Sequence, residues 1–155
     1  MPSPVVGLFS PKAIIHELAS VDRDEVLDEM LRAAIAAGVL PRTRRPQVLE
    51  ALQERERRGS TGLGRGVAIP HAKIPGLRSH AGIVARSSGG VDFRAVDGER
   101  VHVMVMLISP DSRQEEHLAT LRWVSMMARD PDFCSFIRQA RTAEQIFEVL
   151  QERAS

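Results

Sequence analysis

Residues 55–73 read RERRGSTGLGRGVAIPHAK and combine a glycine-rich run with one histidine. Four glycines interrupt the stretch, at Gly59, Gly62, Gly64 and Gly66. Each glycine costs backbone entropy on folding, so such a run indicates positive φ angles or a group that must approach the backbone closely. Pro70 restricts the chain immediately before His71. The stretch therefore predicts a rigidly held histidine beside a loop whose free N–H groups hold an anion.

The stretch resembles the active-site segment of type 2 enzyme IIA domains of the bacterial phosphotransferase system, the fructose, mannitol and nitrogen-regulatory branch. The matching residues are Arg55-Glu56, Gly59-Ser60-Thr61-Gly62, Gly64, Gly66, Ala68, Pro70-His71 and, far downstream, His117-Leu118. The three groups stand in family order, a combination that chance rarely produces. The resemblance extends from about residue 14 to residue 153. It implies that residues 1–155 form a single stand-alone IIA domain.

The composition is that of an ordinary globular domain of 155 residues, long enough to bury a stabilising core without disulfide or metal cross-links. The single Cys134 excludes an internal disulfide, and no N-terminal segment has the pattern of a signal peptide. The longest apolar-rich run, residues 101–108, is far shorter than the roughly 20 residues that cross a bilayer. We therefore expect a cytoplasmic protein that is not embedded in a membrane.

Charge and histidine spacing argue against two other classes of protein. The net charge is +1 and the chain has no tyrosine and one tryptophan, so a nucleic-acid interface is not expected. His16, His80 and His102 lack the spacing of metal ligands, so neither a zinc site nor any other metal or cofactor is expected. Cys134 lies among apolar neighbours and is interpreted as a packed core residue.

Apolar spacing predicts three helices, and capping signals predict two more. The predicted helices are 24–37, 45–58, 114–127, 131–138 and 142–151. Gly38 ends the first helix, and Pro46 is tolerated in the first turn of the second. Asp111 or Ser112 is expected to cap the third helix. The last two begin at an Asp130-Pro131 pair and at a Thr142–Gln145 capping box.

Strand patterns alternate with these helices. The predicted strands are 14–18, 67–69, 82–86, 91–96 and 101–108, with an irregular lead-in at 1–12 and a loop at 73–80. Asp97-Gly98 predicts a hairpin turn between the last two strands. Residues 101–108 are apolar on both faces, as in a central strand. The pattern indicates an α/β fold, a single domain with a mixed sheet sandwiched between helices on both faces, as the resemblance also implies.

His71 is the candidate nucleophile. A loop histidine more often has no chemistry, but imidazole forms a labile phosphoramidate, which suits a carrier that must receive and give away the same phosphoryl group. By the resemblance, His117 lies next to His71 and Arg55 neutralises the phosphoryl charge. Spacing alone does not choose Arg55 over Arg57 or Arg58. The remaining expected site residues form the phosphate-binding loop: Ser60, Thr61, Gly62 and Gly64.

The resemblance implies a phosphocarrier that accepts a phosphoryl group from an HPr-like protein on His71 and passes it to a separate IIB partner of the fructose or mannitol type. The alternative is a nitrogen-regulatory IIA protein whose phosphorylation controls binding to kinases, channels or transporters. A third possibility is a catalytically silent scaffold. That reading requires the site residues to be altered, and in this sequence they are not. The expected docking surface consists of apolar residues near His71: Leu63, Val67, Ile74 and Leu77.

Overall fold

Two long antiparallel strands, β5 and β6, form the centre of the fold in the computed structural model, which describes residues 7–154. The strands are β1 (Phe9–Ile15), β2 (Gly62–Gly64), β3 (Val67–Ala68), β4 (His71–Ile74), β5 (Ala81–Val91) and β6 (Val101–Pro110). The helices are α1 (Arg23–Ala36), α2 (Arg45–Arg57), α3 (Gln114–Ala128), α4 (Pro131–Gln139) and α5 (Ala143–Ala154), with a 3₁₀ turn at Arg42–Arg44.

The sheet is mixed, with the strand order β1-β5-β6-β3-β2. β1 runs parallel to β5, β3 and β4 both run parallel to β6, and β2 pairs antiparallel with β3. β3 pairs with β6 at Val103 and Met104, and β4 pairs with the same strand from Leu107 to Pro110. The segment from β3 to β4 therefore follows one edge of β6, with a step at Pro70.

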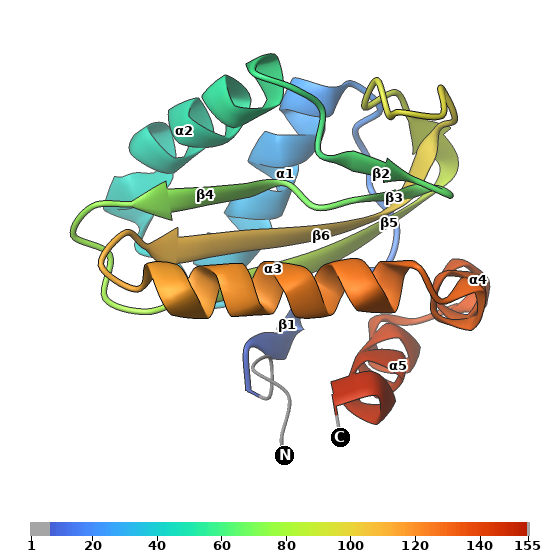
Figure 1. The fold of residues 1–155 in the computed structure, drawn as a ribbon. Helices are drawn as coiled ribbons and strands as arrows, with labels where there is room; N and C mark the ends of the chain where they lie inside the picture. Colours follow the sequence, from blue (N-terminus) through green and yellow to red (C-terminus); the bar gives the residue numbers. More distant parts are fainter. Residues whose placement is uncertain (1–6, 155) are drawn as a thin grey trace.

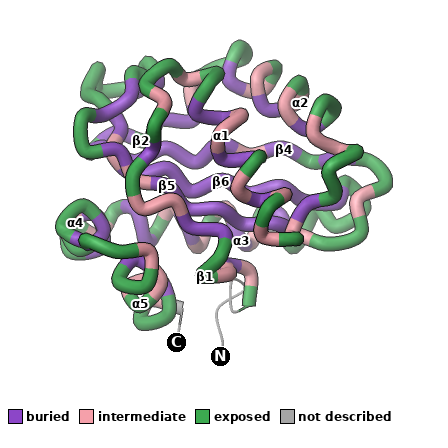
Figure 2. The backbone as a smooth tube through the Cα atoms, turned by 180° about the vertical axis from the view of Figure 1, so that it is seen from behind, coloured by how far each residue is buried: buried purple, intermediate pink, exposed green. Residues whose placement is uncertain are grey.

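Helices cover both faces of this sheet, α1 and α2 on one side and α3, α4 and α5 on the other (Figure 1). Alternate residues of β6 serve the two cores: Met104 and Met106 pack with the first pair of helices, and Val103 and Val105 with the other three. Figure 2 shows the central strands buried and the outer sides of the helices exposed. The predicted fold class is confirmed. Among the described residues, no helix combines the length and apolar character that crossing a bilayer requires.

All five predicted helices are present, and their ends follow the expected capping with one exception. Gly38 has a φ of +76°, Asp130 accepts a bond from Asp132 N–H, and Thr142 accepts one from Gln145 N–H. The exception is α3, whose N-cap is Arg113 without a side-chain bond, so the predicted Asp111 or Ser112 cap is wrong.

The strand predictions need three corrections. β1 begins at Phe9, inside the predicted irregular lead-in; it is an edge strand with a register shift that accommodates Pro11, and residues 1–6 of that lead-in lie outside the described residues. The predicted strand 91–96 does not form, because Arg94 has a φ of +53°. The predicted loop 73–80 begins inside β4, a strand of four residues that pairing with β6 creates.

Candidate functional site

His71 is the first residue of β4 and is fixed by the central sheet. It pairs with Leu107 of β6, and the N–H of Leu107 donates a 2.9 Å hydrogen bond to the Pro70 carbonyl. Pro70 and His71 are therefore both bonded or paired to β6, so the imidazole is carried by the edge of the sheet.

The ring nitrogens of His71 have different roles. Nδ1 lies 2.8 Å from the carbonyl oxygen of Ile69, which can only accept, so Nδ1 carries the hydrogen and Nε2 of the neutral ring keeps its lone pair. Burial lowers the pKa of His71; the bond to Ile69 opposes this, and the charges of Arg55, Arg58 and Lys73 reinforce it. At neutral pH the side chain is thus a neutral imidazole with Nε2 as its nucleophilic atom.

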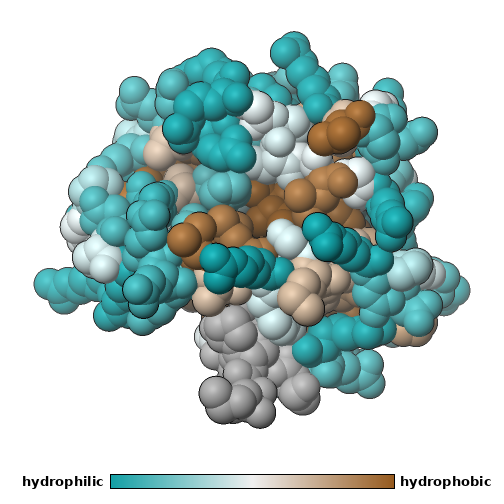
Figure 3. All heavy atoms as spheres, viewed as in Figure 1, coloured by the Kyte–Doolittle hydropathy of each residue, from teal (hydrophilic) through white to brown (hydrophobic). Residues whose placement is uncertain are grey.

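A cleft of about 380 Å³ opens beside His71 between α2, β4 and α3. Its cationic side chains are Arg55, Arg58 and Lys73, which outnumber its one carboxylate, Glu54. Its apolar side chains are Ala51, Ala72, Leu118 and Leu121. In Figure 3 hydrophobic residues gather in the hollow between the two helices, with hydrophilic side chains around them. The cleft thus offers positive charge for an anion and an apolar border for a partner.

His117 enters the same cleft from α3. It is 2 % exposed, its Nδ1 lies 2.7 Å from Ser109 Oγ, and its ring centroid is 5.6 Å from that of His71. Burial, followed by the charges of His71, Lys73 and His80, lowers the pKa of His117 to about 4. The structure therefore brings the two predicted histidines together as neutral rings, and Nε2 is the nitrogen of His117 not occupied by Ser109.

The three neighbouring arginines at the end of α2 have different surroundings. Arg55 and Arg58, one helical turn apart, both line the cleft, and Arg55 donates a 2.7 Å bond to the Gly59 carbonyl. Arg57 instead pairs with Glu54 at 2.8 Å. The predicted Arg55 is therefore well placed, and Arg58 is a second cleft cation that spacing could not identify.

The glycine-rich loop uses its polar groups within the protein. The buried Glu56 carboxylate accepts a 3.1 Å bond from Thr61 N–H and a short one from the Thr61 hydroxyl. Ser60 Oγ accepts from Gly62 N–H at 2.9 Å and donates to the Phe93 carbonyl.

None of the four predicted loop residues lines the cleft. A Cβ at Gly62 would lie 2.7 Å from that of Ala95, and one at Gly64, where φ is +90°, would lie 3.2 Å from the Asp97 carboxylate. Close packing explains both glycines. Direct phosphate binding by Ser60, Thr61, Gly62 and Gly64 stays a prediction.

The docking prediction is wrong for Val67 and Ile74, which are buried because they face the two cores. Leu63 is 46 % exposed and Leu77 is half-buried; neither lines the cleft, and docking at these two residues stays a prediction. Leu118 and Leu121 of α3 do, and Leu118 is 40 % exposed.

Sequence reasoning also missed Lys73, His80 and Ser109. Ser109 had a signal, since it is the one hydroxyl residue in the apolar segment 101–110. Among residues 7–154, no group of three or more His, Cys, Asp or Glu side chains is arranged to hold a metal ion. Cys134 is buried as predicted, and burial raises the pKa of its thiol.

Comparison with known proteins agrees with the geometry. The family model "Phosphoenolpyruvate-dependent sugar phosphotransferase system, EIIA 2" matches residues 7–153. A nitrogen regulatory protein of Bradyrhizobium diazoefficiens is 35 % identical over 147 residues, which are 95 % of this chain and 94 % of that protein. The fructose-specific EIIABC component of Bacillus subtilis is 28 % identical over 96 % of this chain but only 23 % of its own length.

The crystal structure of the nitrogen regulatory protein IIA-Ntr from Neisseria meningitidis has the same fold. Its TM-score is 0.86 with 26 % identity, covering 96 % of this chain and 99 % of that one. The family model alone spans nearly the whole sequence and includes both cleft histidines. The chain therefore belongs to the EIIA type 2 family of the phosphoenolpyruvate-dependent sugar phosphotransferase system.

Proposed function

We propose that this chain is a nitrogen-regulatory IIA protein: His71 receives a phosphoryl group from an HPr-like carrier, and the phosphorylation state of the cleft controls binding to a target protein. The observation that carries the proposal is the state of His71. Its Nδ1 is bonded to the Ile69 carbonyl, so its Nε2 is a nucleophile within a cleft lined by Arg55, Arg58 and Lys73.

The transfer step follows from this geometry. The lone pair of His71 Nε2 attacks the phosphorus of the donor's phosphohistidine; the new N–P bond forms as the donor's N–P bond breaks and its electron pair returns to the donor imidazole. Phosphoryl transfer depends mainly on positioning and on neutralising the equatorial oxygens. The guanidinium groups of Arg55 and Arg58 can supply paired donors, and Lys73 a further charge. His71 loses no proton, because Nε2 carries none.

The regulatory role has physical and comparative support. A phosphoryl group adds roughly two negative charges to a cleft in which three cationic side chains face one carboxylate, Glu54. A partner that contacts Leu118 and Leu121 would meet a differently charged and hydrated surface after phosphorylation. The relative from Bradyrhizobium, called a nitrogen regulatory protein, aligns over nearly its full length, whereas the fructose component aligns over 23 % of its length.

Intact-mass analysis tests the phosphorylation. The protein is mixed with phosphoenolpyruvate, enzyme I and HPr, beside the variant His71→Ala and the control His102→Gln, a half-buried histidine outside the cleft. We expect an acid-labile gain of one phosphoryl group in the wild type and the control, and none in His71→Ala. Wild-type labelling of His71→Ala would contradict the proposal.

Transfer to a IIB partner is the second candidate function, which the similarity to the fructose-specific component favours. Mixing the phosphorylated protein with isolated fructose- or mannitol-type IIB domains separates the two candidates. Rapid loss of the phosphoryl group to IIB would establish the carrier role. Target proteins that bind the phosphorylated and unphosphorylated forms equally would count against the regulatory switch.

A further inference from the structure

A polar chain of four side chains runs from the surface to the buried His117. Glu116 Oε2 lies 2.8 Å from His80 Nε2, and His80 Nδ1 lies 2.9 Å from Ser109 Oγ. The same Ser109 oxygen lies 2.7 Å from His117 Nδ1. Residues from α3, from the start of β5 and from the end of β6 therefore form one continuous path, Glu116–His80–Ser109–His117, that reaches the ring next to His71.

The chemistry of Ser109 couples the two imidazoles. Its side chain is completely buried, and its oxygen lies between two ring nitrogens. A hydroxyl has one hydrogen, so it can donate to one of these rings while it accepts from the other. The hydrogen position on His80 and that on His117 are therefore not independent.

Two arrangements satisfy every partner. The Glu116 carboxylate can only accept, so His80 Nε2 carries a hydrogen in both. When His80 is neutral, its Nδ1 accepts from Ser109, and Ser109 accepts from His117 Nδ1–H, which leaves His117 Nε2 as an acceptor. When His80 is charged, its Nδ1–H donates to Ser109, Ser109 donates to His117 Nδ1, and His117 Nε2 becomes a donor.

The charges around this path come from two elements, α3 and β4. α3 contributes Glu116 and, 3.8 Å from its carboxylate, Arg113. β4 contributes Lys73, which bonds Gln114 at 2.7 Å, and His71, which lies next to His117. Glu116 is the acid that directly contacts His80, and Arg113 and Lys73 are the cations on the same two elements.

We propose that Glu116, His80 and Ser109 form a proton relay that sets the tautomer of His117, so that its Nε2 accepts when His71 is free and donates to the phosphoryl group when His71 is phosphorylated. This inference rests on the proposed phosphorylation of His71. Ser109, His80 and Glu116 are positioning residues, because they act on the reaction centre through His117. The donor tautomer matters because a phosphoryl group presents acceptor oxygens only.

The change from the acceptor to the donor tautomer takes up one proton. A proton from solvent binds His117 Nε2, the hydrogen on His117 Nδ1 passes to Ser109 Oγ, and the Ser109 hydrogen passes to His80 Nδ1. His117 and Ser109 end neutral, and the positive charge resides on His80 beside Glu116. The reverse sequence releases the proton when the phosphoryl group leaves.

Nitrogen NMR of ¹⁵N-histidine-labelled protein tests the relay without relying on activity. In the unphosphorylated wild type we expect His117 Nδ1 to have a pyrrole-like shift at high pH and Nε2 to acquire it as His80 becomes charged. Phosphorylation should raise the midpoint of this exchange, because the phosphoryl group stabilises the donor tautomer. A His117 tautomer that stays constant through the His80 titration, in both forms, overturns the relay.

Variants separate the relay from general support of the site. Glu116→Gln removes the charge that contacts His80 and should move the exchange midpoint, whereas Glu115→Gln, its exposed neighbour at the same helix end, should move it less. His80→Gln, which takes up no proton, should abolish the exchange. Ser109→Ala should slow phosphoryl acceptance roughly 10- to 100-fold and remove its dependence on His80. Equal midpoints in the two glutamate variants would contradict the proposed path.

The two proposals fail in different ways. If the wild type takes up no phosphoryl group, the proposed function is wrong, although the pH-driven exchange in the free protein still reports on the relay. If His71 is phosphorylated and His80→Gln retains the wild-type exchange, the function stands and the relay is wrong.

Discussion

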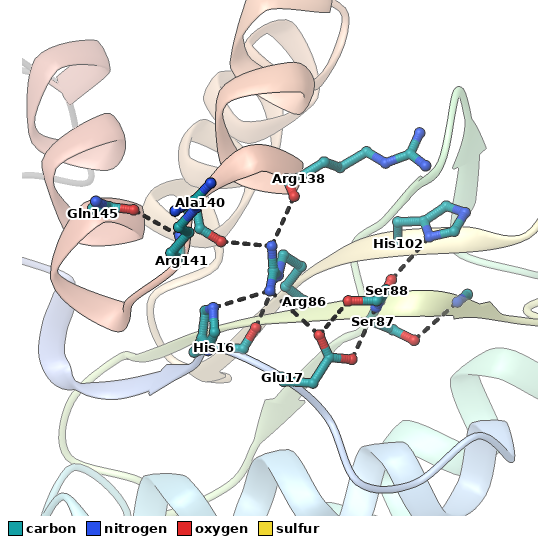
Figure 4. A network of polar contacts seen from close by, with 11 residues as sticks. His16, Glu17, Arg86, Ser87, Ser88, His102, Arg138, Ala140, Arg141 and Gln145 are labelled. Atoms are coloured by element: carbon teal, nitrogen blue, oxygen red, sulfur yellow. Dashed lines mark hydrogen bonds and ion pairs between the residues drawn. The ribbon is translucent and has the colours of Figure 1, made fainter.

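Two polar clusters lie on the same sheet, and they use their hydrogen-bonding capacity differently. At Arg86 of β5 all three guanidinium nitrogens are occupied: Nε by the His16 carbonyl, one terminal nitrogen by the Arg138 and Ala140 carbonyls, and the other by His16 Nε2 and Glu17 (Figure 4). This cluster joins the end of β1 and the α4–α5 junction to the central sheet.

The cleft at His71 is the opposite case. Nδ1 of His71 is bonded to Ile69, so Nε2 is the ring nitrogen that remains for the reaction. Arg58 and Lys73 place cationic groups on the cleft wall. A partly buried, fully bonded arginine such as Arg86 supports the architecture. Polar groups left with bonding capacity beside a cleft are the ones that can act on a ligand.

The largest stability effect is expected at Arg86. Arg86→Leu leaves the carbonyls of His16, Arg138 and Ala140 without their donor and should reduce the free energy of unfolding by about 3 kcal/mol. Urea unfolding measures this, and the rate of phosphoryl acceptance by the folded variant should stay at the wild-type value. Arg86→Lys should recover part of the loss. A large loss of transfer rate in folded Arg86→Leu would break the distinction between the clusters.

Substitution of the cleft arginines should lower the rate of phosphoryl transfer and leave stability nearly unchanged, the reverse of the effect at Arg86. Arg55→Ala and Arg58→Ala should each slow phosphoryl acceptance roughly 10- to 100-fold, because each removes transition-state charge neutralisation. The control is Arg57→Ala, because Arg57 pairs with Glu54 and does not itself line the cleft, and its rate should change much less. Rapid-quench measurement of labelled protein gives the rates. Equal effects for all three arginines would point to net charge rather than position.

The two clusters should also differ in pH dependence. The pKa of His117 is lowered from 6.5 to about 4, so the unfolded chain binds more protons than the fold between these values. Stability from this residue is therefore complete above pH 6.5 and is lost as the pH falls towards about 4. Denaturant unfolding of the wild type and His117→Gln checks this; the variant should lack that loss.

At the Arg86 cluster the loss should begin at lower pH. Burial raises the pKa of Glu17, but hydrogen bonds from Ser88 and the charge of Arg86 outweigh it, and the pKa lies below 4.5. Its contribution is present above pH 4.5 and disappears only below it. Glu17→Gln should therefore leave the loss between pH 6.5 and 4.5 in place. If Glu17→Gln removed the loss of stability between pH 6.5 and 4.5, that loss would arise at the Arg86 cluster and not at His117.

The smallest effect is expected at the apolar border. Leu118→Asp should weaken binding of the HPr-like donor roughly 5-fold, about 1 kcal/mol, with little change in stability. Val96→Asp is the matched control, because Val96 is 90 % exposed and lies outside the cleft lining. Titration calorimetry with unphosphorylated donor measures both. Equal affinities would remove Leu118 from the interface.

Much of the fold could be predicted because its signals are local. The helices follow from apolar spacing and caps such as Asp130-Pro131 and Thr142–Gln145, and β6 from a run that is apolar on both faces. β4 could not be predicted, since its four residues form a strand only by pairing with β6. The strand predicted at 91–96 failed because Arg94 has a positive φ and its N–H donates to the side chain of Asp92 rather than to a neighbouring strand.

The site divides in the same way. The motif identified His71, His117 and Arg55 as candidates, and the fold brings the three to one cleft. Sequence spacing could not show that Thr61 is bonded to buried Glu56, nor that Arg58 shares the cleft. Ser109 and His80 meet His117 only through the packing of β5, β6 and α3, so no linear pattern could connect them.

The central claim is that Nε2 of His71 is the phosphorylated atom because the Ile69 carbonyl holds Nδ1. Phosphorus–nitrogen coupling in ¹⁵N-histidine-labelled, phosphorylated protein identifies that atom directly. We predict a single phosphorus signal coupled to Nε2 of His71, with Nδ1 still protonated. Coupling to Nδ1 of His71, or to a nitrogen of His117 or His80, would contradict the account.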